Sequence, residues 1–241
     1  MIKVHSYESL GTYDGPGIRL VVFLQGCNFE CLYCANPDTI SFKGGQLTDP
    51  EEILRMAISQ KPFFGKKGGI TFSGGEPTLQ AKELIPLFKK LREENINICL
   101  DTNGGIWNDY VEELFSLTDL ILLDIKQFNR DRHLHLTMKT NTQTLQTAKW
   151  LEEHEKPMWL RYVLVPGYTD FREDIIGLGK HFKDYKQIQR VEILPYHTLG
   201  VHKYEALNKP YKLKDVEYNS QEELEITKNI FLQYFSEVHV N

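Results

Sequence analysis

The segment "GCNFECLYCANPD", residues 26–38, holds three of the four cysteines of the chain. These are Cys27, Cys31 and Cys34, in a C-x3-C-x2-C spacing, with Tyr33 directly before the last. The same spacing would also line one face of a buried helix, where free cysteines behave as small apolar side chains. The glycine at the start of the segment and the Asn-Pro-Asp at its end favour a loop instead. We therefore predict that a loop presents three thiol ligands to one site.

Two kinds of metal site are compatible with three thiols. A structural zinc site normally has four protein ligands, and Cys99 or a histidine could supply the fourth. However, Cys99 lies within the apolar run "NICLD" (97–101), which is typical of strand packing. Thiolates also hold iron–sulfur clusters. Three cysteines on a four-iron cluster leave one iron for a substrate or cofactor, which would explain why there are three and not four.

The composition excludes several classes of protein. Of the 241 residues, 41% are hydrophobic and 25% charged, as in ordinary globular proteins. The net charge of −5 does not suggest a general nucleic-acid binder, which shows a basic patch or stripe. Apolar runs such as "LILLDI" are too short to cross a bilayer, and no signal peptide is visible. We expect a cytoplasmic protein without nucleic-acid or membrane partners, in which clustered cysteines indicate metal or redox chemistry.

Short apolar runs alternate along the chain with longer helical patterns. The predicted strands are 19–26, 69–72, 97–101, 120–126, 158–165 and 190–196. The predicted helices are 48–60, 77–95, 107–117, 142–155, 170–184 and 220–235. The apolar runs lack polar alternation, as expected of parallel strands covered on both faces. Six β-then-α units are fewer than the eight of a closed barrel. We predict an α/β fold, an open partial TIM-like (β/α)6 barrel with parallel strands, in a single domain over residues 1–241; a doubly wound sheet is the alternative. Residues 201–221 are expected to be irregular.

Polar and glycine-rich motifs follow each predicted strand. They are the cysteine loop, "SGGEPT" (73–78), "DTNGG" (101–105), "DIKQF" (124–128), "PGYTD" (166–170) and "YHTLG" (196–200). In barrels the active site is built at the carboxyl ends of the strands, so we expect these motifs to share one site. Asp101 and Asp124 would repel each other there unless a cation lies between them, and Lys126 is a candidate. Arg161, within a predicted strand, needs a carboxylate or main-chain oxygens as its partner.

The cysteine motif with its aromatic residue resembles the signature of the radical S-adenosylmethionine (SAM) superfamily. "SGGEP" is similar to the glycine-rich motif with which that family holds the methionine amino group. "GTYDGPGIR" (11–19) resembles the leader of the activases of glycyl radical enzymes, and the likeness continues in "CLDTNG", "LLDIKQ", "RYVLVPGYTD" and "LPYHTLG". Residues 35–72 lack cysteine, whereas many activases of other glycyl radical enzymes insert a cysteine-rich domain there. This favours the compact type that acts on pyruvate formate-lyase.

This resemblance implies roles for individual residues. Cys27, Cys31 and Cys34 would hold a [4Fe-4S] cluster whose open iron binds SAM. The residues implied to bind SAM are Tyr33, Ala35, Gly74, Gly75, Glu76, Asp101, Asp124, Ile125, Lys126 and His197. Ala35 stands where some relatives have a histidine. Glu76 is expected mainly to hold the conformation of its own loop. Asp101, Thr102 and Asp124 would hold a monovalent cation. Asp14, in the DGPG turn at the cleft mouth, and Arg161 would meet the glycine loop of the protein substrate.

The resemblance also implies an activity. SAM would be cleaved reductively to a 5′-deoxyadenosyl radical, which takes a hydrogen atom from a backbone glycine of pyruvate formate-lyase. A small protein such as flavodoxin or ferredoxin would supply the electron, and we expect a monomer. Three alternatives stay open: an activase of another glycyl radical enzyme, a radical SAM enzyme acting on a small molecule, and a noncatalytic iron–sulfur or zinc protein. The last usually shows four protein ligands, and this loop has three.

Overall fold

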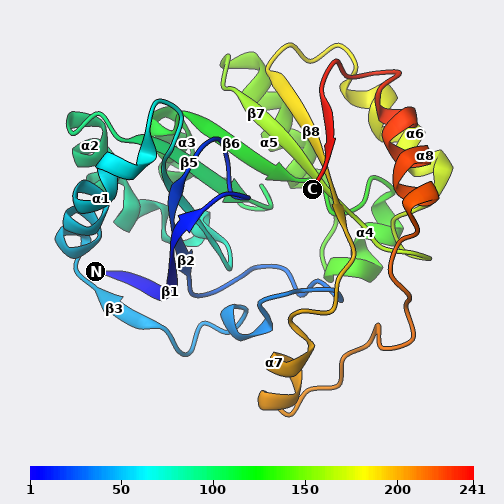
Figure 1. Cartoon of the computed structure of the whole chain (residues 1–241), viewed down its shortest axis with the longest axis horizontal. Helices are drawn as coiled ribbons and strands as arrows, with labels where there is room; N and C mark the ends of the chain where they lie inside the picture. The colour runs from blue at the N-terminus through cyan, green and yellow to red at the C-terminus, as the bar shows by residue number, and fades with distance from the viewer. The chain divides into compact units, whose positions relative to one another are not determined.

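The computed structural model describes all 241 residues, which form two compact units (Figure 1). The first unit comprises Met1–Asn28 and Thr39–Leu122, and the second comprises Phe29–Asp38 and Leu123–Asn241. The boundary therefore falls inside the cysteine segment. Cys27 belongs to the first unit, whereas Cys31 and Cys34 belong to the second. The prediction of a single domain over residues 1–241 stays a prediction.

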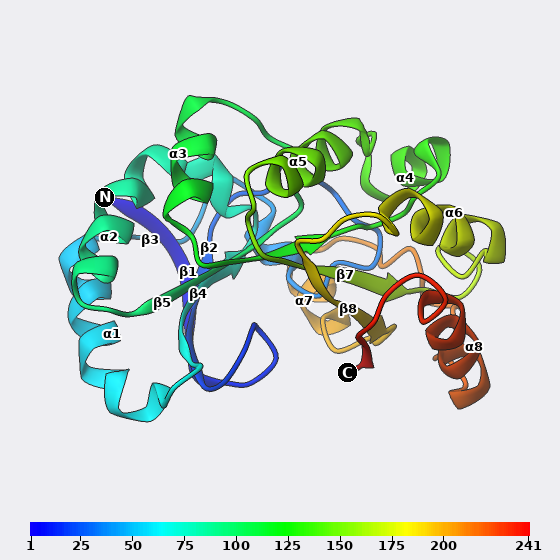
Figure 2. The same ribbon diagram turned by 90° about the horizontal axis from the view of Figure 1, so that it is seen from above.

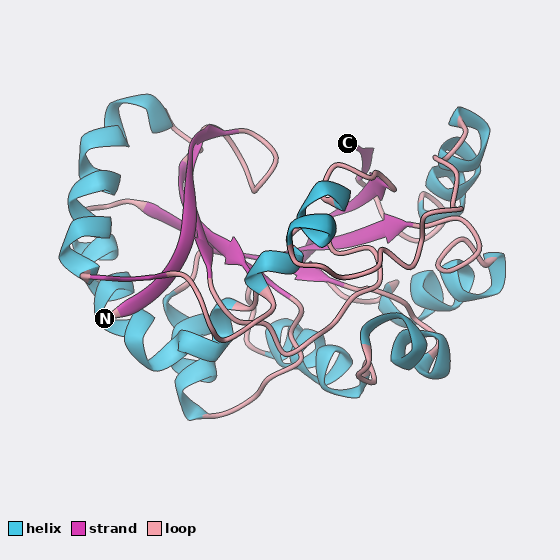
Figure 3. Cartoon of the chain, turned by 90° about the horizontal axis from the view of Figure 1, so that it is seen from below, coloured by secondary structure: helices cyan, strands magenta, loops and turns pink.

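A mostly parallel sheet forms the first unit. Its strands are β1 (Ile2–Gly11), β2 (Arg19–Leu24), β3 (Gln46–Thr48), β4 (Gly69–Gly74) and β5 (Asn97–Thr102), in the order β3-β1-β2-β4-β5. The next strand, β6 (Leu120–Asp124), begins in the first unit, and its last two residues belong to the second. Strands β2, β4 and β5 run parallel, while β1 runs antiparallel to both β2 and β3. Figure 3 shows β1 as a long curved strand, and its register with β2 shifts twice. Strands β2 and β4 are buried along almost their whole length, which explains their lack of polar alternation.

The helices of the first unit lie on one side of its strands (Figure 2). They are α1 (Pro50–Phe64), α2 (Ala81–Glu93) and α3 (Asp109–Leu117), and a short 3-10 turn (Pro77–Gln80) precedes α2. The side chain of Asp49 caps α1, and Pro50 occupies its first turn, as the sequence predicts. Phe88 of α2 packs on Phe72 of β4 with ring centroids 4.8 Å apart. Such contacts place the amphipathic helices on the sheet.

The second unit pairs β7 (Met158–Leu164), β8 (Ile188–Pro195) and β9 (Val238–Val240) in parallel. Its helices are α4 (Arg130–Thr137), α5 (Thr142–Glu153), α6 (Arg172–Phe182), α7 (Val201–Ala206) and α8 (Gln221–Phe231). Helices α6 and α8 lie side by side in both views (Figures 1 and 2). Ser220 and Glu223 form a capping box at the start of α8, and Phe231 packs edge-on against Tyr162 of β7.

All six predicted strands and all six predicted helices are confirmed, as is the open, mostly parallel α/β sheet. The antiparallel pairing is additional to the predicted strands: β1 returns directly into β2, and such a short connection joins antiparallel strands. Residues 201–206, expected to be irregular, form α7. The sequence also missed β1, β3, β9 and α4. No helix of the chain is both long enough and apolar enough to cross a bilayer.

Candidate active site

Cys27 lies just beyond the carboxyl end of β2, in a turn held by backbone hydrogen bonds. The N–H of Cys27 donates to the carbonyl of Ile40 at 3.1 Å, and the N–H of Gly26 donates to Thr39 at 2.8 Å. The carbonyl of Gly26 accepts from the N–H of Glu76 at 2.7 Å. Two separate segments of the first unit therefore fix the backbone that carries this cysteine.

The two glycines of the SGGEP motif allow this close approach. A Cβ on Gly75 would lie 2.0 Å from the carbonyl oxygen of Gly26, and a Cβ on Gly74 would lie 2.4 Å from the nitrogen of Leu24. Gly74 also has a φ of +103°, a backbone conformation that favours glycine. The sequence predicts glycines here for the approach of a ligand. In the structure, the lack of a side chain at both glycines lets the backbone of Leu24 and Gly26, just before Cys27, pack against them.

Glu76 is buried at 1% exposure and organises the loop that contains it. Its carboxylate accepts hydrogen bonds from both the N–H and the hydroxyl of Thr78, from the hydroxyl of Thr102 at 2.7 Å and from the N–H of Asn103 at 2.8 Å. Burial raises the pKa of Glu76, while the hydrogen bonds from Thr102, Thr78 and Asn103 oppose that shift. The carboxylate thus ties the loop after β4 to the loop after β5, which is the organising role the sequence favours.

Asp101 lies at the carboxyl end of β5, beside the end of β4. Its Oδ2 accepts a hydrogen bond from the Ser73 hydroxyl at 2.7 Å. The first unit therefore gathers Cys27, the SGGEP loop and the Asp101–Thr102 pair at the carboxyl ends of β2, β4 and β5. This is the arrangement predicted from the positions of these motifs after separate strands.

Asp14 lies at the opposite end of the same strands. The backbone carbonyl of Asp14 accepts from the hydroxyl of Thr71, and the fully buried Arg19 holds the turn by donating to the carbonyls of Pro16 and Ile70 at 3.0 and 2.8 Å. Arg19 begins β2, so the turn sits at the amino ends of the strands. Those ends lie roughly 17 Å from the carboxyl ends, because each of about five residue steps adds about 3.3 Å. The structure therefore does not group Asp14 with the carboxyl-end residues.

The second half of the cysteine segment is anchored within the second unit. The N–H groups of Glu30 and Leu32 donate to the last carbonyls of α4, both at 3.0 Å. The Tyr204 hydroxyl, from α7, donates to the carbonyl of Cys34 at 3.2 Å. Gly200, just before α7, approaches Ala35 so closely that a Cβ would lie 2.4 Å from the carbonyl oxygen of Ala35. Helices α4 and α7, which the sequence missed, therefore position this part of the loop.

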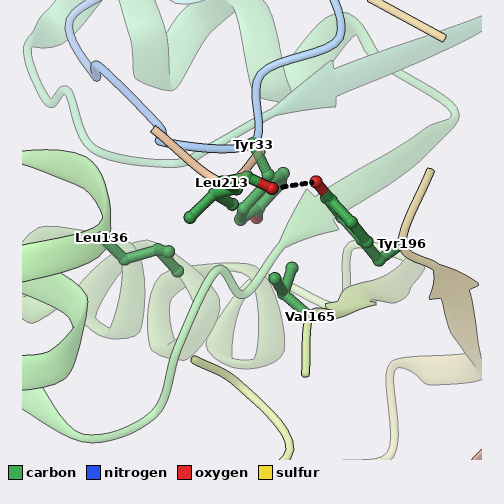
Figure 4. Close-up of a cluster of buried hydrophobic side chains, with 5 residues drawn as sticks. All are labelled: Tyr33, Leu136, Val165, Tyr196 and Leu213. Atoms are coloured by element: carbon green, nitrogen blue, oxygen red, sulfur yellow. Dashed lines mark hydrogen bonds between the residues drawn. The ribbon is translucent and has the colours of Figure 1, made fainter. Parts of the chain in front are cut away.

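Tyr33 inserts into a small apolar cluster of the second unit (Figure 4). The other members are Leu136, Val165, Tyr196 and Leu213, and Tyr196 donates to the carbonyl of Leu213 at 3.2 Å. The hydroxyl of Tyr33 is buried without a hydrogen-bond partner. An unpaired buried hydroxyl is costly, so a polar group of a bound molecule would improve this environment.

Asp124 and Lys126 form an ion pair at the end of β6. The ammonium of Lys126 lies 2.6 Å from Asp124 Oδ2 and 5.8 Å from the ring centroid of Tyr33, and both charged side chains are 16% exposed. Burial acts to lower the pKa of Lys126, but attraction to Asp124, and then to Tyr33 and Cys31, outweighs it and holds this pKa well above the usual value. Lys126 therefore stays protonated in the folded protein.

Arg161 meets the carboxylate that its burial requires. Its Nε lies 3.5 Å from Glu192 Oε2, and the two residues face each other across β7 and β8. The carbonyl of Arg161 accepts from the N–H of Ile125 at 2.9 Å. His197, beyond the end of β8, is exposed, and its Nδ1 accepts from the N–H of Leu199 at 3.4 Å.

The donor set fits an iron–sulfur cluster rather than a four-thiolate zinc site. None of the four cysteines forms a disulfide, and Cys27, Cys31 and Cys34 are partly exposed. Cys99 is buried inside β5, and burial raises the pKa of its thiol to about 12. A thiol in that environment is a poor thiolate ligand. The prediction that Cys99 serves strand packing is confirmed.

Asn103 is a residue of this region that the sequence did not single out. Its side-chain amide donates to Asn28 at 2.8 Å and lies 3.9 Å from the sulfur of Cys27. Its position directly after Asp101 and Thr102 was the available signal, but "DTNGG" also reads as a plain turn. Tyr204 and its neighbour Lys203, which reaches Asn36 at 2.7 Å, lie in a segment that carries no motif.

Comparison with known proteins agrees with this arrangement. The model of the "Radical SAM superfamily" matches residues 21–178. A pyruvate formate-lyase-activating enzyme of Staphylococcus aureus (strain USA300) is 48% identical over 223 residues, which cover 89% of this chain and 88% of the relative.

Two solved structures share the fold. A domain of pyruvate-formate lyase-activating enzyme from Bacteroides vulgatus has a TM-score of 0.61 at 22% identity, over 72% of this chain and 99% of that one. Streptococcus suis SuiB, bound to its precursor peptide SuiA, has a TM-score of 0.70 at 18% identity, over 92% of this chain and 48% of that one. The protein therefore belongs to the radical SAM superfamily and, within it, to the family of pyruvate formate-lyase-activating enzymes.

Proposed function

We propose that the protein activates pyruvate formate-lyase by installing a glycyl radical in its backbone. The main support is the S. aureus relative, which is named for this activity. The two sequences are 48% identical, and the alignment covers nearly the full length of both. A bound [4Fe-4S] cluster would supply the electron for the reductive cleavage of SAM to methionine and a 5′-deoxyadenosyl radical, and this radical would take a hydrogen atom from the glycine. The chain itself binds, orients and shields the reactants.

The cluster is held by Cys27, Cys31 and Cys34. This proposal is supported by two observations: three partly exposed cysteines outside any disulfide lie within eight residues of chain, and the fourth cysteine is buried in a strand. The turn that carries Cys27 is fixed by its contact with the SGGEP loop. The carbonyl of Cys34 is fixed by Tyr204. Both ends of the motif are therefore held before any metal arrives.

SAM is bound with Tyr33 and Ala35 near the adenine and with the backbone of Gly74 and Gly75 at the methionine end. The unpartnered hydroxyl of Tyr33 supports this proposal. The remaining proposed contacts are Glu76, Asp101, Asp124, Ile125, Lys126 and His197. Because the carboxylate of Glu76 is saturated by internal hydrogen bonds, its contribution is to hold the loop in place.

A monovalent cation beside SAM is held by Asp101, Thr102 and Asp124. Oxygen ligands of this kind suit hard cations. The hydroxyl of Thr102 donates to Glu76 and accepts from the N–H of Gly104 at 3.0 Å, which leaves one lone pair of its oxygen for a cation. Asp101 is oriented by Ser73, and Asp124 is held by Lys126.

The protein substrate enters as its glycine loop and meets Arg161, whereas Asp14, at the opposite ends of the strands, is not part of this proposal. A structural neighbour, SuiB, is described bound to a precursor peptide, so this fold accommodates peptide substrates. The glycine must come within contact distance of the adenosyl carbon, because transfer of a hydrogen atom needs near-attack geometry. Flavodoxin or ferredoxin supplies the electron, and the protein acts as a cytoplasmic monomer of one radical SAM domain.

Cleavage of SAM by the reduced protein tests this proposal. Anaerobically reconstituted protein should release 5′-deoxyadenosine, and a peptide copying the glycine loop of pyruvate formate-lyase should accelerate that release. A peptide with the glycine replaced by a bulky residue is the control. Arg161→Ala should weaken the acceleration more than it weakens SAM binding. A reduced, cluster-loaded protein that releases no 5′-deoxyadenosine with either peptide would exclude the proposed chemistry.

A further inference from the structure

The side-chain amide of Asn103 lies beside Cys27, a proposed cluster ligand. Asn103 follows Thr102 in the loop after β5 and is 5% exposed. Its Oδ1 accepts from the N–H of Gly105 at 2.8 Å. Its Nδ2 donates to Asn28 Oδ1 at 2.8 Å and lies 3.9 Å from Cys27 Sγ, within the range of an N–H···S hydrogen bond.

The orientation of this amide follows from its partners. The two ends of an asparagine amide are distinguished by the groups that they face. The Gly105 N–H can only donate, so the atom that faces it must be the oxygen. The NH2 group must therefore face Asn28 and the sulfur of Cys27.

The backbone of Asn103 is fixed as firmly as its side chain. Its N–H donates to Glu76 Oε2 at 2.8 Å, and the hydroxyl of the preceding Thr102 donates to Oε1 at 2.7 Å. The Glu76 carboxylate is itself buried and held by Thr78. The amide is thus preorganised beside Cys27 by a network that lies entirely within the first unit.

We propose that Asn103 is a positioning residue for Cys27: it donates an N–H···S hydrogen bond to the thiolate and makes the bound cluster easier to reduce. Hydrogen bonds to the sulfurs are among the terms that set the potential of an iron–sulfur cluster. A donor stabilises negative charge on sulfur, and the reduced cluster carries one more electron than the oxidised one. The bond therefore favours the reduced state. This inference rests on the cluster of the proposed function and adds to it a residue that no cysteine pattern identifies.

The test compares Asn103→Ala and Asn103→Asp in the full chain, reconstituted anaerobically without SAM or pyruvate formate-lyase. A redox titration followed by electron paramagnetic resonance gives the midpoint potential. In Asn103→Ala the ratio of reduced to oxidised cluster at a fixed potential should fall about threefold to tenfold, or ~28–59 mV for a one-electron couple. Asn103→Asp keeps the acceptor for Gly105 but places a carboxylate near the sulfur, so its ratio should fall further.

Asn28→Ala is the matched control, because it removes the other partner of the amide and leaves the donor beside the sulfur. In Asn28→Ala the ratio of reduced to oxidised cluster at a fixed potential should stay within about twofold of the wild-type ratio, or ~18 mV. Resonance Raman spectra should show a changed Fe–S(Cys) stretching frequency in Asn103→Ala and not in Asn28→Ala. Unchanged potentials in both Asn103 variants, with full iron content, would overturn the inference.

Loss of the cluster is also informative. If both Asn103 variants lose iron while their apo forms melt like the wild type, the loss is specific to the Cys27 ligand and supports the contact. If the apo forms melt at lower temperature, Asn103 merely stabilises its loop and the inference fails. Wild-type protein that takes up no four-iron cluster would instead defeat the proposed function, so the two failures are distinguishable.

Discussion

The carboxylate of Glu76 and the hydroxyl of Thr102 lie 2.7 Å apart, and their hydrogen bond joins the SGGEP loop to the end of β5. Glu76 also binds the N–H of Asn103, and its own N–H donates to Gly26 beside Cys27. One buried side chain therefore links the cysteine turn, the glycine-rich loop and the loop after β5. The stability of this region should depend on that carboxylate.

Glu76→Gln should lower the free energy of unfolding by about 1.5–3 kcal/mol, the value of one hydrogen bond to a charged group. Both carboxylate oxygens accept hydrogen bonds, so the NH2 of glutamine must face at least one donor. Glu83→Gln, at an exposed position of α2, is the control and should change this energy by less than about 0.5 kcal/mol. Urea unfolding measures both. Equal changes in the free energy of unfolding in the two variants would contradict the conclusion that Glu76 holds these loops together.

Gly75→Ala should displace the turn that carries Cys27, because the added methyl would lie 2.0 Å from the carbonyl oxygen of Gly26. The expected result is a loss of more than half of the bound iron after reconstitution. Gly65→Ala is the control: a Cβ there meets no atom within 4 Å, although this glycine, unlike Gly75, has a positive φ. It should cost about 1–3 kcal/mol of stability and keep its iron. Normal iron content in Gly75→Ala would count against the contact.

The ion pair of Asp124 and Lys126 should make stability depend on alkaline pH. The folded-state pKa of Lys126 lies well above the ordinary lysine value of 10.5, because attraction to Asp124 outweighs the effect of burial. The contribution of the pair is therefore complete below the unfolded pKa and is lost as the pH rises through the folded pKa. In that window the free energy of unfolding should fall by up to about 1.4 kcal/mol per pH unit.

Lys126→Met should remove this part of the pH dependence, and Lys66→Met, at an exposed position, controls for the loss of one charge. Urea unfolding from about pH 9 to pH 12 gives the profiles. The difference between wild type and Lys126→Met should be largest at the lower end and shrink as the pH rises. A difference that stays constant across the range would show that the pair does not couple to folding.

The alanine variants of the four cysteines should fall into two groups by the iron content of the reconstituted protein. Cys27→Ala, Cys31→Ala and Cys34→Ala should each abolish the brown colour of the reconstituted protein. Cys99→Ala should keep about four irons per chain, because this thiol is buried in β5. Its cost should appear instead as a loss of about 1 kcal/mol of stability from the vacated volume. Loss of iron in Cys99→Ala with unchanged stability would reopen the question of a fourth ligand.

Much of the fold was predictable because parallel strands buried on both faces leave continuous apolar runs. Strand β1 was missed because more than half of its side chains are partly or fully exposed and no such run marks it. Strands β3 and β9 are three residues long, so only their pairing partners define them. Helix α4, "RDRHLHLT", is polar on most sides, and its helical pattern is correspondingly weak.

The candidate site divides in the same way. Residues that stand at strand ends in recognisable motifs, such as Asp101 and Lys126, could be predicted from the sequence. The partner of Arg161 could be predicted by type, as a carboxylate, but not as Glu192. Contacts such as that of Asn103 with Cys27 could not be predicted, because they join residues 76 positions apart and depend on how two loops pack.

The most direct test of the account is the product of the reaction with the complete partner. Reduced, cluster-loaded protein is mixed anaerobically with SAM and pyruvate formate-lyase, and the mixture is examined by electron paramagnetic resonance. The account predicts the signal of a glycyl radical on pyruvate formate-lyase, absent when the SAM is omitted and absent with Cys31→Ala. A protein that cleaves SAM under these conditions and yet never produces that radical would contradict it.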